Sequence, residues 1–290
     1  MMGLFAPLLL ALAGTVVVAV IGNRLRPRHS AWLSAAAIGS VFGTVLVASW
    51  AVALGFLAHE PVAGELFGWC REAFGVHHPL PRWVGVPALA TALWATARAG
   101  RVVRMWRRGR GSGAGRVRVV EVDRPVAFAE TGRAGGVVVS TAMLAALSTE
   151  ECRAMLAHEY AHLRHRHDRF LVVGSLAAGV AVLAPAVKQL RHALERWADE
   201  DAAAALGDRC VVAGAVARAA LVAHDGPVPV MSMLGADVPA RVEALMRPPI
   251  SNGEAWSWAA FAGVIVATAV ASATVQLHHL GVVFAAICPG

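Results

Sequence analysis

Long apolar runs constrain the fold of this chain more than any other feature of its sequence. Five of them stand out, at residues 4–21, 32–57, 83–97, 170–187 and 255–275. A helix of about 20 apolar residues is long enough to cross the hydrocarbon core of a bilayer. Hydrophobic residues make up 57% of the 290 residues and charged residues only 16%, too few to cover the surface of a water-soluble domain. We therefore expect a mainly α-helical integral membrane protein.

The basic residues beside these runs predict how the chain crosses the cell membrane. Arg24, Arg26 and Arg28 follow the first run, whereas a signal peptide carries its positive charges before the apolar segment. A second basic group, at residues 98–110, follows the third run. Positive residues flank the cytoplasmic ends of membrane spans. The pattern predicts three spans within residues 1–108, an N-terminus outside the cell and a cytoplasmic domain after the third span.

The net charge of +7 has the same explanation, because basic residues beside apolar runs are what membrane insertion requires. We therefore expect a lipid bilayer as a partner and no nucleic acid. The four cysteines lie far apart without a CxxC pair, which disfavours a zinc ribbon. Cys70 and Cys288 would both face the oxidising side of the membrane and could form a disulfide bond.

Residues 116–250 have the pattern of a folded domain that follows a glycine-rich linker. β-Branched runs at its start, near residues 116–122, 126–130 and 137–140, predict a small β-sheet. Ser148 and Glu151 have the spacing of a capping box and predict the start of a helix. An edge of the sheet could bind an extended peptide through main-chain hydrogen bonds, or the sheet could simply pack beneath the helix.

The sequence His158-Glu159-Tyr160-Ala161-His162 is an HExxH motif on this predicted helix. Residues four apart lie on one face of a helix, so both imidazoles can bind one zinc ion. Glu159 lies beside the metal, where it can take a proton from the attacking water and pass it to the leaving amine. Tyr160 is expected to point away from the metal. The motif therefore predicts a zinc-dependent hydrolase.

A third protein ligand is expected further along the chain. Glu195, in a helical segment, can complete a site with two histidines and one glutamate, which leaves a position for water. Asp199, one turn on, can accept a hydrogen bond from the second nitrogen of a ligand histidine. The alternative is that both belong to the solvated face of an amphipathic helix. A metzincin is excluded, because His165 and Asp168 occupy the places of its glycine and third histidine.

Together, the HExxH motif, an ExxxD that begins at Glu195 and an RVxxL that begins at Arg241 resemble the gluzincin membrane peptidases over about residues 117–249. The resemblance is to the BlaR/MecR-type antirepressor peptidases. The CAAX prenyl protease and HtpX-type quality-control proteases are the related branch. The resemblance implies one catalytic zinc ion on His158, His162 and Glu195, and a protein substrate. In the antirepressor branch that substrate would be a cytoplasmic repressor.

Two departures from that family bear on function. The chain ends soon after its last apolar run, so we expect no extracellular penicillin-binding sensor and no direct β-lactam sensing. Relatives often carry an aspartate five residues after the second histidine of the motif, where this chain has His167. His165 and His167 could act as accessory ligands, but a basic helix face near lipid headgroups is the favoured interpretation.

The apolar run at residues 170–187 creates a topological problem. A single crossing there would place Glu195 across the membrane from His158, and one zinc site cannot be assembled from both sides. About eighteen residues, at about 1.5 Å per residue, also cannot make two complete spans. We therefore expect a membrane-associated hairpin that turns near Gly179 or Pro185 and returns Glu195 to the cytoplasm. The total is then about four spans, with both chain ends outside.

Other chemistry is either open or disfavoured. The sequence does not choose an oxyanion donor among Arg241, His192 and His224, and no serine lies in a nucleophile elbow. Two classes remain: a metalloendopeptidase that cuts a cytoplasmic or membrane-proximal protein, and a non-catalytic zinc-binding signalling or scaffold protein. A transporter is disfavoured because intramembrane charges are missing. The intact Glu159 favours the enzyme, because a structural zinc site needs no base.

Overall fold

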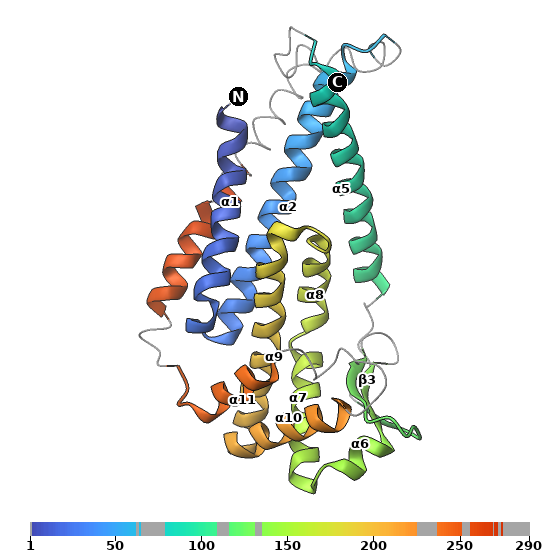
Figure 1. Cartoon of the computed structure of the whole chain (residues 1–290), viewed down its shortest axis with the longest axis vertical. Coiled ribbons are helices and arrows are strands. Elements are labelled where there is room, and N and C mark those ends of the chain that lie inside the picture. The colour runs from blue at the N-terminus through green and yellow to red at the C-terminus, as the bar shows by residue number, and fades with distance from the viewer. Residues whose placement is uncertain are drawn as a thin grey trace.

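The computed structural model describes residues 2–61, 64, 79–108, 116–130, 135–224, 237–250, 256–268, 270–271 and 274. Figure 1 shows long helices in the upper part and shorter helices with a small sheet below them. The expected mainly helical fold with a small sheet is confirmed. The predicted Cys70–Cys288 disulfide lies outside the described residues.

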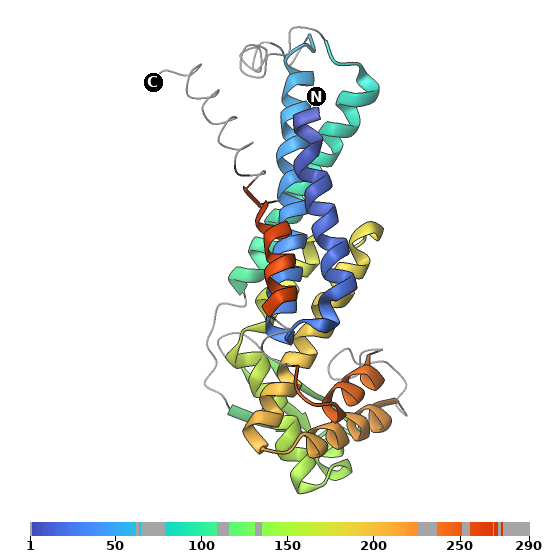
Figure 2. The same ribbon diagram turned by 90° about the vertical axis from the view of Figure 1, so that its left-hand side faces the viewer.

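Three long helices form the upper part: α1 (Met2–Ile21), α2 (Pro27–Leu57) and α5 (Arg82–Arg108). A short 3-10 turn, η1 (Gly22–Arg24), links α1 to α2. A further helix, Trp256–Thr268, lies beside α1 (Figure 2). Its Ala262 and Val266 share one buried apolar cluster with Val18 of α1 and Ala37 of α2.

Among the described residues, α2 is the one helix whose length and composition would let it cross a membrane. Leu8–Arg24 and Trp256–Thr268 are shorter apolar helices. α5 differs from expectation, because it continues past residue 97 through the basic run to Arg108. Arginine favours helix, and its alternation with apolar residues keeps one face polar. The four-span arrangement stays a prediction.

The predicted strands form a three-stranded sheet in the order β1-β3-β2. β1 (Arg116–Val120) is parallel to β3 (Gly136–Ser140), and β2 (Ala127–Glu130) is antiparallel to it. β3 lies in the centre and is buried along its whole length, as its apolar run requires. β2 is an edge strand and packs against the helix that carries the HExxH motif.

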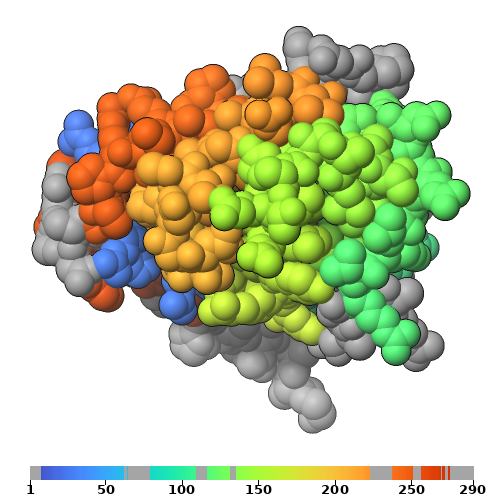
Figure 3. Space-filling model, turned by 90° about the horizontal axis from the view of Figure 1, so that it is seen from below, coloured from blue at the N-terminus to red at the C-terminus, as the bar shows by residue number. Residues whose placement is uncertain are grey.

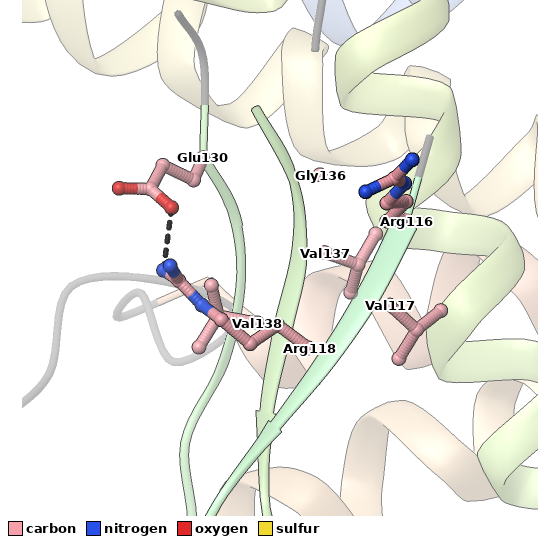
Figure 4. A pocket seen from close by; sticks show the side chains of 7 residues that line it. All are labelled: Arg116, Val117, Arg118, Glu130, Gly136, Val137 and Val138. Carbon is pink, nitrogen blue, oxygen red and sulfur yellow. Dashed lines mark hydrogen bonds and ion pairs between the residues drawn. The ribbon is translucent and has the colours of Figure 1, made fainter. Parts of the chain in front are cut away.

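A hollow of about 300 Å³ lies against this sheet, with the ion pair between Arg118 and Glu130 beside it (Figure 4). It is lined by Arg116, Val117, Arg118, Glu130, Gly136, Val137 and Val138. None of the predicted site residues is among them, so the hollow is separate from the histidine motif.

The lower helices are α6 (Thr141–Ala146), α7 (Thr149–Arg164), α10 (Arg209–His224), α11 (Val238–Met246) and the end of α9 (Ala184–Leu206). α7 begins with the predicted capping box, in which Ser148 and Glu151 each accept a hydrogen bond from the other's backbone N–H. Buried residues of these helices, including Met155, Ala202 and Val216, form one core. Seen from below, the same helices make a continuous surface beside the strands (Figure 3).

The apolar run at residues 170–187 folds as a helical hairpin. α8 (His167–Leu176) leads into a turn and the short η2 (Ala181–Leu183), after which α9 runs back (Figure 1). Gly179 sits in the turn with a φ of 81°, which glycine adopts without steric cost. Leu183 and Leu190 pack with Ile38 of α2, so the hairpin is joined to the long helices. α9 thereby carries Glu195 back to the level of α7.

We expect Gly136→Ala to destabilise the protein by about 1–3 kcal/mol, the usual cost of overpacking. A Cβ at this position of β3 would lie 2.2 Å from the carbonyl oxygen of Arg116 in β1. Gly43→Ala in α2 is the control, since a Cβ there meets no atom within 4 Å. Thermal unfolding in detergent measures both variants. Equal melting temperatures would contradict the close approach of β1 to β3 at Gly136.

Candidate metal centre

The hairpin brings the three predicted ligands together. His158 and His162 lie on α7 and Glu195 lies on α9. One donor atom from each residue lies within 4.8 Å of the other two, which makes this a group that could hold a metal ion. His158 is buried, whereas the side chains of His162 and Glu195 remain 18% and 26% exposed. The site is therefore buried on one side and accessible on the other.

The spacing of the donor atoms fits a tetrahedral zinc site. The Nε2 atoms of His158 and His162 lie 3.1 Å apart. The carboxylate oxygens of Glu195 lie 3.5 Å from the first nitrogen and 3.6 Å from the second. Ligands placed about 2.0–2.1 Å from a tetrahedral zinc ion are separated by about 3.3 Å. The residues present therefore fit zinc in both donor type and spacing.

Asp199 connects His158 to Arg241 inside the protein. Asp199 Oδ1 lies 2.9 Å from His158 Nδ1. Arg241 donates from Nε and Nη2 to the two Asp199 oxygens at 2.7 and 2.6 Å, and its Nη1 lies 3.0 Å from Glu195 Oε2. Burial opposes ionisation of Asp199, but the guanidinium holds the pKa of this carboxyl far below its usual value. The buried pair thus supports a histidine and a glutamate of the candidate site.

Glu159 lies on α7 beside the same group and is 3% exposed. Burial raises the pKa of its carboxyl group to about 7. His158 and a hydrogen bond from the backbone N–H of Ala129 in β2 act in the opposite direction. A carboxyl group with a pKa near neutrality can both accept and release a proton. Burial also lowers the pKa of His162 to about 4, which keeps that imidazole neutral, as a metal ligand must be.

The expectation that His165 and His167 form a basic helix face near headgroups is wrong. α7 ends at Arg164, and Arg166 has a φ of 54°, so the chain turns before α8 begins. His167 is 1% exposed, and its Nδ1 lies 2.8 Å from Nδ1 of His162. His165 Nε2 lies 2.5 Å from an Asp201 oxygen. The expectation failed because it assumed that one helix continues through both residues.

The three candidate oxyanion donors are placed differently. Arg241 directs its guanidinium at Asp199 and Glu195. His192 lies on α9 one turn before Glu195, with its Nδ1 3.5 Å from an Asp237 oxygen. His224 is the last residue of α10, and its side chain lies outside the described residues. An oxyanion role for any of them stays a prediction.

Arg209 secures α11, a contact that no sequence motif indicated. It forms an ion pair with Glu200 of α9. It also donates to the backbone carbonyl oxygens of Ala244 and Leu245, at 3.0 and 2.9 Å. These carbonyls belong to the last turn of α11, where helices lack internal partners. Arg209 therefore caps the helix that carries Arg241 and fixes it to α9.

Comparisons with known proteins connect this region with metallopeptidases. Residues 100–225 match the model of peptidase family M48. A segment of 67 residues is 40% identical to a protease HtpX homolog of Acidiphilium cryptum (strain JF-5), and it covers 22% of this chain and 23% of that protein. No solved structure gives a match. These matches support the M48 metallopeptidases broadly and give no support to the BlaR/MecR subtype.

We expect Arg241→Met to destabilise the protein by about 3–5 kcal/mol, because it leaves the buried Asp199 carboxylate without its counter-charge. Arg247→Met, at the C-cap of α11, is the control. Its ion pair with Glu243 joins side chains that are 71% and 61% exposed, and such pairs contribute about 0–1 kcal/mol. Denaturant unfolding of both variants measures the difference. Equal losses would rule out a buried structural role for Arg241.

Proposed function

We propose that this protein is a membrane-embedded zinc metalloendopeptidase that cuts a cytoplasmic or membrane-proximal protein. The observation that carries the proposal is the cluster of His158, His162 and Glu195, whose donor atoms lie within 4.8 Å of one another next to the buried Glu159. A structural zinc site would need neither an adjacent carboxylate base nor an accessible side. The matches to family M48 and to a named protease support the same class of reaction.

The metal site is assigned to the two histidines and Glu195. A zinc ion held there would supply the Lewis acidity that makes water nucleophilic at neutral pH and polarises a peptide carbonyl. The chain's own contribution is to fix the ligands. Asp199 directs His158, and Arg241 holds both Asp199 and Glu195. Such outer contacts fix which nitrogen of a ligand histidine faces the metal.

Glu159 is the proton carrier in this proposal. It takes a proton from the water that attacks the peptide carbonyl and later delivers that proton to the leaving amine. A pKa near 7 suits both steps, because the group is neither too weak a base nor too weak an acid. The backbone N–H of Ala129 holds the carboxylate on the side of β2. Arg241 is occupied by its carboxylate partners, which leaves His192 and His224 as the candidate oxyanion donors.

The substrate is proposed to bind as an extended segment beside β2. This strand is an edge of the sheet, and Ala129 contacts the proton-carrying Glu159. A peptide added to that edge would place its carbonyl groups next to the site. Because the pairing uses main-chain hydrogen bonds, a peptide of any sequence that adopts an extended conformation could bind there. The local match to an HtpX homolog favours the quality-control branch over repressor cleavage.

The membrane arrangement is proposed from the long helices. α1, α2, α5 and the helix at Trp256–Thr268 would span the bilayer, and the site would face the cytoplasm. Leu9, Val16 and Val20 on α1 are exposed apolar side chains that lipid would cover. Trp32 and Trp256 are also exposed, near the ends of their helices that face the catalytic part. Tryptophan at such positions is typical of membrane interfaces.

Glu159→Gln is the central test of catalysis. It should reduce peptide cleavage by at least about 100-fold, because it removes the base while sparing the ligands. New protein N-termini in cells that express wild type or variant at equal levels measure the effect, and zinc content is measured on both purified proteins. Glu150→Gln is the control, since Glu150 is an exposed residue of the same helix.

The outcomes separate the enzyme from a scaffold. Cleavage products that appear with wild type and Glu150→Gln, but not with Glu159→Gln, support the peptidase, and their sequences identify the substrates. Identical N-terminal profiles for all three proteins, with equal zinc content, would favour a non-catalytic zinc-binding scaffold. A cleaved transcriptional repressor among the products would instead support the antirepressor function.

A further inference from the structure

We propose that His167 is a positioning residue for the metal centre. It accepts a hydrogen bond from Nδ1–H of His162 and thereby keeps the Nε2 lone pair of His162 directed at the zinc ion. The inference rests on the proposed function, because it concerns how one of the proposed zinc ligands is oriented. His167 itself lies outside the HExxH and ExxxD motifs.

The distances define which nitrogen atoms can carry protons. His162 turns its Nε2 toward Nε2 of His158 and toward Glu195, at 3.1 and 3.6 Å. If Nε2 binds a metal, the proton of the neutral ring must sit on Nδ1. That Nδ1 lies 2.8 Å from Nδ1 of His167. His167 must then be the acceptor, with its own proton on Nε2.

The backbone before His167 is bent in a way that produces this contact. Arg166 is the only residue other than glycine with a positive φ in the described part of the chain. An arginine in the left-handed region is strained, and such strain is often found where a functional site requires it. Without the turn, His167 would continue along α7, where a residue five positions after His162 points to a different face. The bend instead returns its ring to His162.

The ring of His167 is held tightly on its other sides. Trp197 of α9 lies 4.9 Å from it between ring centroids, and Phe170 lies 6.3 Å away. His165 stacks on it at 5.8 Å. With 1% exposure, the ring has little freedom to move away from His162. A fixed acceptor is what orientation of a ligand requires, since a mobile one would not restrict the imidazole.

Packing alone does not explain a histidine in this position. Its Nε2 is buried without a hydrogen-bond partner among the described residues, which costs free energy that an apolar side chain would avoid. The cost is explained if Nδ1 is needed as an acceptor.

Three substitutions of His167 separate positioning from packing. Asn places its oxygen near the location of Nδ1 and keeps the acceptor. Gln places its polar group nearer Nε2, and Leu fills the space without any acceptor. We expect His167→Asn to keep nearly wild-type zinc affinity. We expect His167→Gln and His167→Leu to lose about 10–100-fold, the usual effect of removing a partner of a metal-bound histidine.

The measurement is a titration of the full-length protein in detergent with Zn²⁺ against a competing chelator. The absorption spectrum of the Co²⁺-loaded protein reports the ligand geometry, and melting temperatures of the zinc-free proteins report packing. If His167 served only for packing, the His167→Leu variant would be at least as stable as the His167→Asn variant and would bind zinc at least as tightly. His59→Leu is the control, because His59 lies just after α2, with its Nδ1 3.0 Å from the carbonyl oxygen of Gly55, and should leave zinc affinity unchanged.

Each outcome addresses a separate claim. The positioning role is supported if wild type binds zinc most tightly, His167→Asn binds it nearly as tightly, and His167→Gln and His167→Leu bind it more weakly. Equal affinity of Asn, Gln and Leu would overturn it while leaving the zinc peptidase intact. If Leu fails to fold, the comparison of Asn with Gln decides the question. Wild type that binds no zinc would overturn the proposed metal centre itself.

Discussion

The ion pair between Asp199 and Arg241 is the interaction on which the rest of the candidate site depends. Both side chains are nearly fully buried, and two hydrogen bonds join them. A carboxylate or a guanidinium alone in such a place would be very unfavourable, so each requires the other. The pair links α9 to α11 and, through His158, to α7. Three helices that carry the site are thereby held in one arrangement, and Arg209 closes the end of α11.

The hairpin of α8 and α9 reconciles this site with the apolar sequence between its parts. The run at residues 170–187 is too short for two spans, and a single span would separate the ligands. A turn at Gly179 allows the chain to leave the site and return to it beside the long helices (Figure 1). The packing of Leu190 against α2 then joins the position of Glu195 to the long-helix bundle. The long helices and the candidate site are therefore packed together through the hairpin.

The proximity of His158, His162 and Glu195 could be predicted because it follows from short rules. Helical periodicity places the two histidines on one face, and the topological argument requires Glu195 to return to them. The capping box at Ser148 is equally local. The contact of His167 with His162 could not be predicted. It depends on the left-handed backbone conformation of Arg166, which residues other than glycine rarely adopt. The RVxxL motif pointed to Arg241, but its carboxylate partners depend on how α11 docks. α5 extends beyond the expected apolar span because the basic run after residue 97 also continues the helix.

X-ray absorption at the zinc edge of the purified, full-length protein tests the central claim most directly. The account predicts four-coordinate zinc with nitrogen and oxygen ligands at about 2.0–2.1 Å, two imidazoles among them and no sulfur. Substitution of Glu195 by Gln should change the oxygen contribution and leave both imidazoles in place. A spectrum with sulfur ligands, or one that Glu195→Gln leaves unaltered, would contradict the assignment of His158, His162 and Glu195 as the metal centre.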